Sequence, residues 1–132
     1  MIITTHAYAR AGLVGNPSDG YYGKTISFII RNFKATVRLW ESPHFEILPG
    51  HGDLARFDSV RDFLRDQRLH GYYGAMRLIK ATVKRFHDWC RDQGIDLHDR
   101  NFTIGFESDI PRLVGLSGSS AIICATVRAL QQ

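Results

Sequence analysis

The spacing of apolar residues differs between the first fifty residues of the chain and the remainder. Short runs rich in β-branched and aromatic residues come first, and such runs are typical of strands. Later the apolar positions step by three and four residues, which is the repeat of one face of a helix. We therefore expect a block of strands, followed by helices with one more strand among them. The expected strands are Ile2–Arg10, Thr25–Arg31, Ala35–Trp40, Phe45–Leu48 and Asn101–Glu107.

The second part predicts three helices and, with the strands, an α+β fold. Ser59, with Asp62 three residues later, fits a helix N-cap and predicts a short charged helix to about Gln67. A longer helix, ended by Gly94, has one apolar face and one basic face that we expect to be solvated. A last apolar helix is expected over Ser119–Gln132. The apolar face comprises Tyr72, Met76, Ile79, Val83, Phe86 and Cys90, and the basic face comprises Arg77, Lys80, Lys84, Arg85 and Arg91.

Composition restricts the class of protein. A chain of 132 residues, 44% hydrophobic and 23% charged, has the values of one globular domain, which excludes disordered and collagen-like classes. The net charge of +4 favours anionic partners but is too small for a nucleic-acid-binding tail. The only cysteines, Cys90 and Cys124, exclude a disulfide framework and a four-ligand zinc site, and they favour a reducing compartment. Because no apolar run reaches about 18 residues and the N-terminus lacks a signal-peptide pattern, we expect a cytoplasmic protein that does not span a membrane.

The segment Pro111–Ala121 is the strongest candidate for chemistry. It follows an expected strand, opens an expected helix and carries two glycines and three serines. Glycines let backbone N–H groups turn toward one point, and a helix start adds unpaired N–H groups and the positive end of its dipole, which together form a phosphate cradle. The alternative is an ordinary N-cap after a flexible turn, where serine and glycine are also common. The cradle residues are Gly115, Leu116, Ser117, Gly118, Ser119 and Ser120.

A second candidate is the segment from Arg10 to Asp19. An arginine at a strand end and an aspartate across a Gly/Pro turn would offer one pocket a cation for phosphate or carboxylate and an acceptor for sugar hydroxyls. The alternative is a tight turn in which Asp19 caps the backbone. The residues alone leave both interpretations open.

Together the two segments resemble the GHMP kinases, the small-molecule kinases of galactose, homoserine, mevalonate and phosphomevalonate. The first family motif, Arg-x-x-Leu-Ile-Gly-Glu-His-x-Asp, is matched in register by Arg10, Leu13, Val14, Gly15 and Asp19. The family phosphate loop, Pro-x-x-x-Gly-Leu-Gly-Ser-Ser-Ala, is matched by Pro111, Gly115, Leu116, Gly118, Ser119, Ser120 and Ala121. Two departures, Asn16-Pro17 in place of Glu-His and Ser117 inserted before Gly118, resemble the glucuronokinase branch of the family.

The resemblance implies a fold, an activity and roles for residues. The fold is that of a ribosomal S5 domain 2-like N-terminal domain, with a mixed or antiparallel sheet packed by helices. The activity is transfer of the γ-phosphoryl of ATP to the anomeric hydroxyl of a sugar acid, with ATP and Mg²⁺ as cofactors. Arg10 would neutralise charge at the transferring phosphoryl, Asn16 and Asp19 would bind the sugar, residues 115–120 would hold the ATP phosphates, and Ser120 would ligate Mg²⁺.

The family pattern also predicts more chain than is present. The catalytic acidic residue of the family, where one is used, and a third glycine-rich motif lie beyond the position of Gln132, so residues 1–132 are expected to be a truncated N-terminal domain without its C-terminal domain. Two alternatives remain. One is the same chemistry on another sugar, with Lys24 or Arg31 as candidates for reading a substrate carboxylate. The other is a non-catalytic nucleotide- or RNA-binding module, for which nucleic acid is the less favoured partner because a phosphate loop with three serines is not required there.

Overall fold

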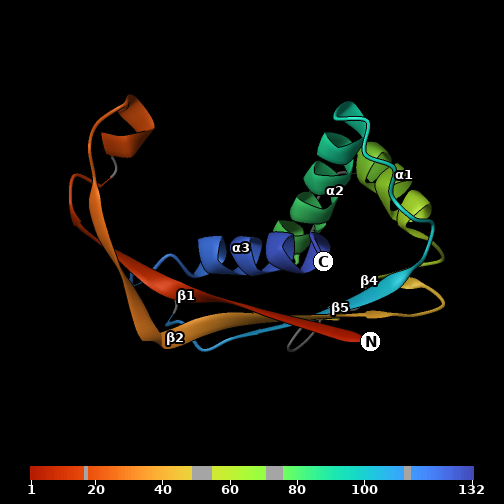
Figure 1. The fold of residues 1–132 in the computed structure, drawn as a ribbon, viewed down its shortest axis with the longest axis horizontal. Helices are drawn as coiled ribbons and strands as arrows, with labels where there is room; N and C mark the ends of the chain where they lie inside the picture. Colours follow the sequence, from red (N-terminus) through yellow and green to blue (C-terminus); the bar gives the residue numbers. More distant parts are fainter. Residues whose placement is uncertain (17, 49–54, 71–75, 112–113) are drawn as a thin grey trace.

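The computed structural model describes residues 1–132 except 17, 49–54, 71–75 and 112–113. These residues form one five-stranded sheet in the order β1-β2-β5-β3-β4, and the α-helices lie on one of its faces (Figure 1). All neighbouring strands are antiparallel except β3 and β5, which are parallel. The predicted α+β class with a mixed sheet is therefore confirmed. The elements are β1 (Ile2–Val14), the 3-10 helix η1 (Ser18–Tyr21), β2 (Ile26–Glu41), β3 (Phe45–Leu48), β4 (Ala55–Phe57), α1 (Val60–His70), α2 (Arg77–Asp92), β5 (Phe102–Ser108) and α3 (Gly118–Leu130).

The prediction of two separate strands after residue 25 is wrong, because β2 is continuous. It pairs with β1 along its length, but the register shifts where Tyr8 faces Lys34 and the next residue, Ala9, faces Ile30. Residues 31–33 thus form a bulge, and the polar and aromatic break in the apolar pattern marks this bulge rather than a turn. Beyond the bulge the hairpin rises away from the rest of the sheet (Figure 1). We call this part, residues 9–30, the distal arm.

The helix α3 packs closely on β1 and β2 through alanines. Six alanines at this contact, three from the helix and three from the two strands, are at most 7% exposed. Side chains this small let a helix approach a sheet closely. Two hydrogen bonds fix the position further, from the Thr5 hydroxyl to the Ala125 carbonyl (2.7 Å) and from Arg128 Nη1 to the His6 carbonyl (2.7 Å). The six alanines are Ala7, Ala9, Ala35, Ala121, Ala125 and Ala129.

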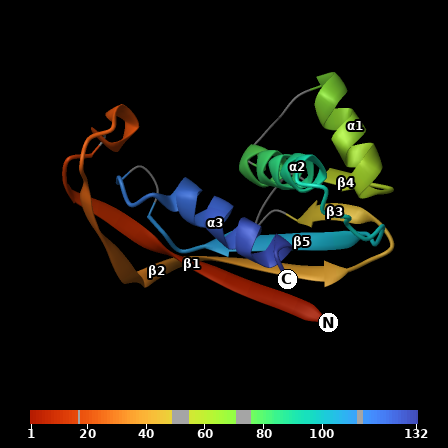
Figure 2. The same ribbon diagram turned by 45° about the horizontal axis from the view of Figure 1, so that its top comes forward.

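The opposite end of the sheet is filled by phenylalanines. Phe45 of β3 is fully buried, and its ring lies 4.8 Å from that of Phe63 in α1 and 5.1 Å from that of Phe102 in β5. Phe57 of β4 closes the cluster, at 5.2 Å from Phe63. The strand β4 was not predicted from the sequence, because three residues show no usable alternation. Figure 2 shows this end, with α1 over β3 and β4.

Two predicted helix ends, the start of α1 and the end of α2, are confirmed. The Ser59 hydroxyl accepts a hydrogen bond from the Asp62 N–H (3.0 Å) at the start of α1. At the end of α2, Gly94 is left-handed with φ +69°, and the Ile95 N–H reaches back to the Cys90 carbonyl (2.8 Å), as in a Schellman motif.

The prediction that the basic face of α2 is solvated is wrong at Lys80. This residue is only 8% exposed, because it stands at the edge of the buried face, beside Val83, where its aliphatic stem can pack. Trp89, on another side of α2, is half-exposed and lines a groove of about 540 Å³ between α2 and α3.

Among the described helices, none combines the length and the apolar character needed to cross a membrane.

Candidate active site

The loop before α3 holds an unusual backbone conformation. Gly115 has φ +76°, and Ser117 has φ +56° and ψ +37°, so both lie in the left-handed region. A serine there crowds its Cβ against the backbone at a cost of about 1 kcal/mol or more, which the surrounding structure has to offset. Such strain in a glycine-bearing loop is typical of ligand sites.

The start of α3 is not closed by an ordinary cap. Ser117 occupies the N-cap position, yet its side chain makes no capping hydrogen bond, whereas a usual N-cap serine accepts one from the first turn. In the described part of the chain, the backbone N–H groups of Gly118, Ser119 and Ser120 have no hydrogen-bond acceptor. Free N–H groups at the positive end of a helix form an anion-binding concavity. The geometry thus favours the cradle over the N-cap interpretation.

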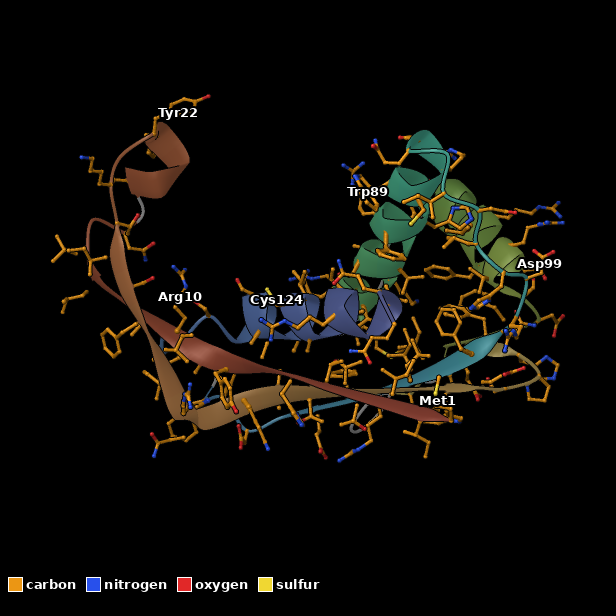
Figure 3. The ribbon with its side chains drawn as sticks, viewed as in Figure 1. Met1, Arg10, Tyr22, Trp89, Asp99 and Cys124 are labelled. Atoms are coloured by element: carbon orange, nitrogen blue, oxygen red, sulfur yellow. The ribbon has the colours of Figure 1, made fainter. Side chains whose placement is uncertain are left out.

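Arg10 joins the two candidate segments, although 107 residues separate it from Ser117. Its backbone N–H donates to the Leu116 carbonyl (3.1 Å), and its Nη2 donates to the Ser117 hydroxyl (3.5 Å). The half-buried side chain lies on the side of β1 that carries α3 (Figure 3). A guanidinium charge therefore stands beside the loop and the helix start.

The remaining loop residues differ in how much the fold requires them. A Cβ at Gly118 would lie 3.4 Å from Ile110 Cγ2, an ordinary contact, so the fold itself tolerates a side chain there. Ser119 and Ser120 are exposed, with their hydroxyls available to a ligand.

The residues predicted to bind sugar lie on the distal arm. Asn16 is exposed and packs over Gly12, where an added Cβ would be 3.0 Å from Asn16 Cβ. The backbone of Asp19 lies in η1, and its side chain lies outside the described part of the structure, as does Pro17. The structure therefore places Arg10 with the loop, and it places Asn16 six residues further along the chain, in the turn beyond the end of β1.

No metal cluster is preformed in the part of the chain that the structure describes. No group of three or more His, Cys, Asp or Glu side chains gathers there. The histidine His44 lies with its Nδ1 3.6 Å from Asp58 at the far end of the sheet.

Sequence reasoning missed the contacts that hold the loop against β1. Leu116 lies in the predicted loop, but nothing in the sequence shows that its carbonyl receives the Arg10 N–H, and Ile110, which lies against Gly118, belongs to neither motif. No sequence signal could have identified them, because their partners are set by how α3 packs on the sheet. The motif residues themselves were recognisable from their types and spacing.

Comparison with known sequences finds one family model and two relatives that are similar to this chain. Residues 76–132 match the family model described as "GHMP kinases N terminal domain". Two proteins of Arabidopsis thaliana are similar over nearly the whole chain. One, named "Probable glucuronokinase 2", is 47% identical over 94% of this chain and 34% of its own length. The other, named "Glucuronokinase 1", is 44% identical over 97% of this chain and 36% of its own length. The chain therefore spans about a third of the length of these relatives.

Solved structures agree on the fold. A mevalonate kinase superposes on 98% of this chain, and the chain on 40% of it, with a TM-score of 0.77 at 17% sequence identity. The mevalonate kinase of Methanococcus jannaschii covers 99% of this chain, and the chain covers 39% of it, with a TM-score of 0.75 at 20% identity. The predicted resemblance in sequence and fold is confirmed.

Proposed function

Because the chain has the fold of GHMP kinases and residues 76–132 match their N-terminal domain, we propose that it is the N-terminal part of an ATP-dependent sugar kinase. The proposed substrate is a sugar acid, glucuronate, and the product is its 1-phosphate. The names of the two Arabidopsis thaliana relatives support this choice. Since the chain spans about a third of those relatives, the complete enzyme would supply the remaining catalytic groups.

The contact between Arg10 and the loop is the observation that carries the proposal. Phosphoryl transfer requires a held phosphate and a positive charge near the transferring group, and little covalent chemistry from the protein. The free N–H groups of residues 118–120 would hold the ATP phosphates. The guanidinium of Arg10, anchored at Leu116 and Ser117, would neutralise the charge that develops on the γ-phosphoryl.

In this proposal the distal arm positions the sugar that accepts the phosphoryl group. Asn16 and Asp19 would hydrogen-bond the sugar hydroxyls and aim the anomeric oxygen at the γ-phosphorus. A bond forms between that oxygen and phosphorus, and the bond from phosphorus to the β,γ-bridging oxygen breaks, which leaves ADP. The hydroxyl proton leaves to a base that the complete enzyme provides.

Mg²⁺ fits this site as an ion carried by the nucleotide. The exposed hydroxyl of Ser120 can supply one oxygen ligand, and phosphate oxygens, water and groups of the complete enzyme would supply the rest. When bound, the ion neutralises charge on the β- and γ-phosphates.

The test is an assay of ADP formation by the complete enzyme with glucuronate. Arg10→Ala should lower kcat by about 10²- to 10³-fold, the loss seen when one charge-stabilising donor is removed. The matched control is Arg38→Ala, because Arg38 pairs with Glu107 on the surface, where both side chains are at least half exposed. The control should keep both activity and melting temperature.

Two results would contradict the proposal. If Arg10→Ala behaves like Arg38→Ala, the arginine has no part in turnover. If the melting temperature and activity of Arg10→Ala fall together, its role is to hold the loop and not to stabilise charge.

A further inference from the structure

The loop at the tip of the distal arm is closed by contacts between its two ends. Gly15 has φ +84°, and a Cβ added there would collide with the carbonyl oxygen of Lys24. The Ser18 hydroxyl bridges these ends, since it contacts both the Gly15 carbonyl and the Lys24 carbonyl, the latter at 3.2 Å. The Gly23 N–H closes the loop on the Ser18 carbonyl (2.8 Å). The backbone of Lys24 is therefore held next to Gly15, the residue that precedes Asn16 in the chain.

Three cations lie on or beside the distal arm, and two of them have partners. Arg10 donates to Ser117, as described above. The guanidinium of Arg31 lies 5.9 Å from the ring centre of Tyr8, in a cation–π contact. The exposed side chain of Lys24 has no partner among the residues that the structure describes. Lys24 is also the only cationic residue between Arg10 and Arg31.

The backbone beside Lys24 is strained. Tyr22 has φ +61° and a fully exposed ring, at the tip of the arm in Figure 3. A bulky residue rarely adopts this conformation, and it persists only where neighbouring contacts impose it, as the Ser18 contacts do here. Strain of this kind is concentrated at ligand clamps. The loop is thus built to hold the residues from Tyr22 to Lys24 in a set position.

The spacing along the arm suits a monosaccharide between Arg10 and Lys24. Arg10 lies on β1, which ends at Val14, and the five residue steps from Arg10 to Gly15 span about 17 Å if extended. Two long cationic side chains with one sugar between them can bridge that distance. A phosphate at one end and a carboxylate at the other would each meet a positive charge.

We propose that Lys24 selects sugar acids over neutral sugars by pairing its ammonium with the substrate carboxylate. The inference rests on the proposed kinase function and adds the residue that reads the substrate class. A lysine is suited to this role because its ammonium is a compact point charge on a flexible stem. A charge-assisted hydrogen bond of this type, once removed, leaves the carboxylate without its partner and weakens only acidic substrates.

The experiment compares Lys24→Gln, Lys24→Arg and the wild type in the complete enzyme. ADP formation is measured with glucuronate, with glucose as the neutral sugar, and with ATP varied. Lys24→Gln should lower kcat/KM for glucuronate by about 10- to 100-fold, with no loss for glucose and no change in the KM for ATP. Lys24→Arg keeps the charge and should recover part of the loss. Lys34→Gln is the matched control, because Lys34 is an exposed lysine of β2 outside the arm.

The outcomes separate the two proposals. An active wild type with an unchanged Lys24→Gln variant would overturn the role of Lys24 and leave the kinase function standing. Equal losses with glucuronate and glucose would also overturn it, since they indicate damage to the loop. A wild type that phosphorylates no sugar would overturn the kinase function and the role of Lys24 together.

Discussion

The two ends of the sheet are packed by opposite means. At one end Phe45, Phe57, Phe63 and Phe102 fill the space between α1 and the strands. At the other end six buried alanines line the contact of α3 with β1 and β2. Large rings bury much apolar surface and stabilise the fold, whereas alanines bury little but allow close approach of the backbones.

This difference indicates that one end of the sheet mainly stabilises the fold, whereas the other end positions the proposed site. The proposed phosphate loop, residues 115–120, is continuous with α3, so its position depends on how deeply the alanine-lined helix lies on β1. The short distance lets the Arg10 N–H reach the Leu116 carbonyl. The phenylalanine end contains none of the proposed site residues. We therefore expect substitutions at the two ends to have different consequences.

The largest expected effect is on stability, from Phe45→Ala. Removing a fully buried ring that contacts three others should cost about 3–5 kcal/mol of unfolding free energy. Nucleotide affinity per folded molecule should not change, because the ring is remote from the loop. Urea unfolding and calorimetric titration with Mg-ATP measure the two quantities. The control is Phe28→Ala, a half-exposed ring on the distal arm.

A loss of nucleotide affinity in folded Phe45→Ala, as large as the loss of stability, would contradict the separation of the two ends. It would mean that the phenylalanine end also positions the loop.

A smaller cost in stability, with a larger effect on the site, is expected from Ala125→Leu. Ala125 is fully buried against the sheet, so added bulk should cost about 1–3 kcal/mol and lift α3. A displacement of the loop by about 1 Å can reduce turnover roughly 100-fold. Cys124→Leu, at the neighbouring exposed position, is the control and should be nearly neutral. Turnover of Ala125→Leu within a few-fold of the control would show that close packing does not set the loop.

The smallest expected effect is at Asp88 of α2, which belongs to neither end. The hydrogen bond from Lys84 is the main cause that lowers the pKa of Asp88, assisted by Arg91 and opposed by desolvation. Because the folded pKa lies below the unfolded value, the charged carboxylate stabilises the fold above about pH 4, and this contribution is lost as the pH falls through the folded pKa. Asp88→Asn should therefore cost about 0.5 kcal/mol at pH 7.

Unfolding free energies of Asp88→Asn and wild type, measured as a function of pH, test this expectation. The two should converge well below pH 4, whereas the more exposed Asp92→Asn should differ little from wild type at any pH. A difference that persists in acid would show that the hydrogen bond, and not the charge, stabilises α2.

The sequence by itself determined the features that depend on neighbouring residues. The repeat of apolar positions gave α2 and β5, Ser59 and Gly94 marked helix ends, and the glycines and serines of residues 115–120 marked the loop. Each of these signals arises from local backbone geometry, which a few residues specify. The two motifs in chain order also indicated the resemblance to the GHMP kinases, which the comparisons confirm.

Only the tertiary structure decided what those features do together. Pairing with β1 made β2 continuous across its bulge, and packing beside Val83 buried Lys80. The close approach of α3 brought Arg10 to Ser117 across 107 residues. Contacts of this kind depend on how deeply elements pack and on strand register, and no local pattern records either quantity.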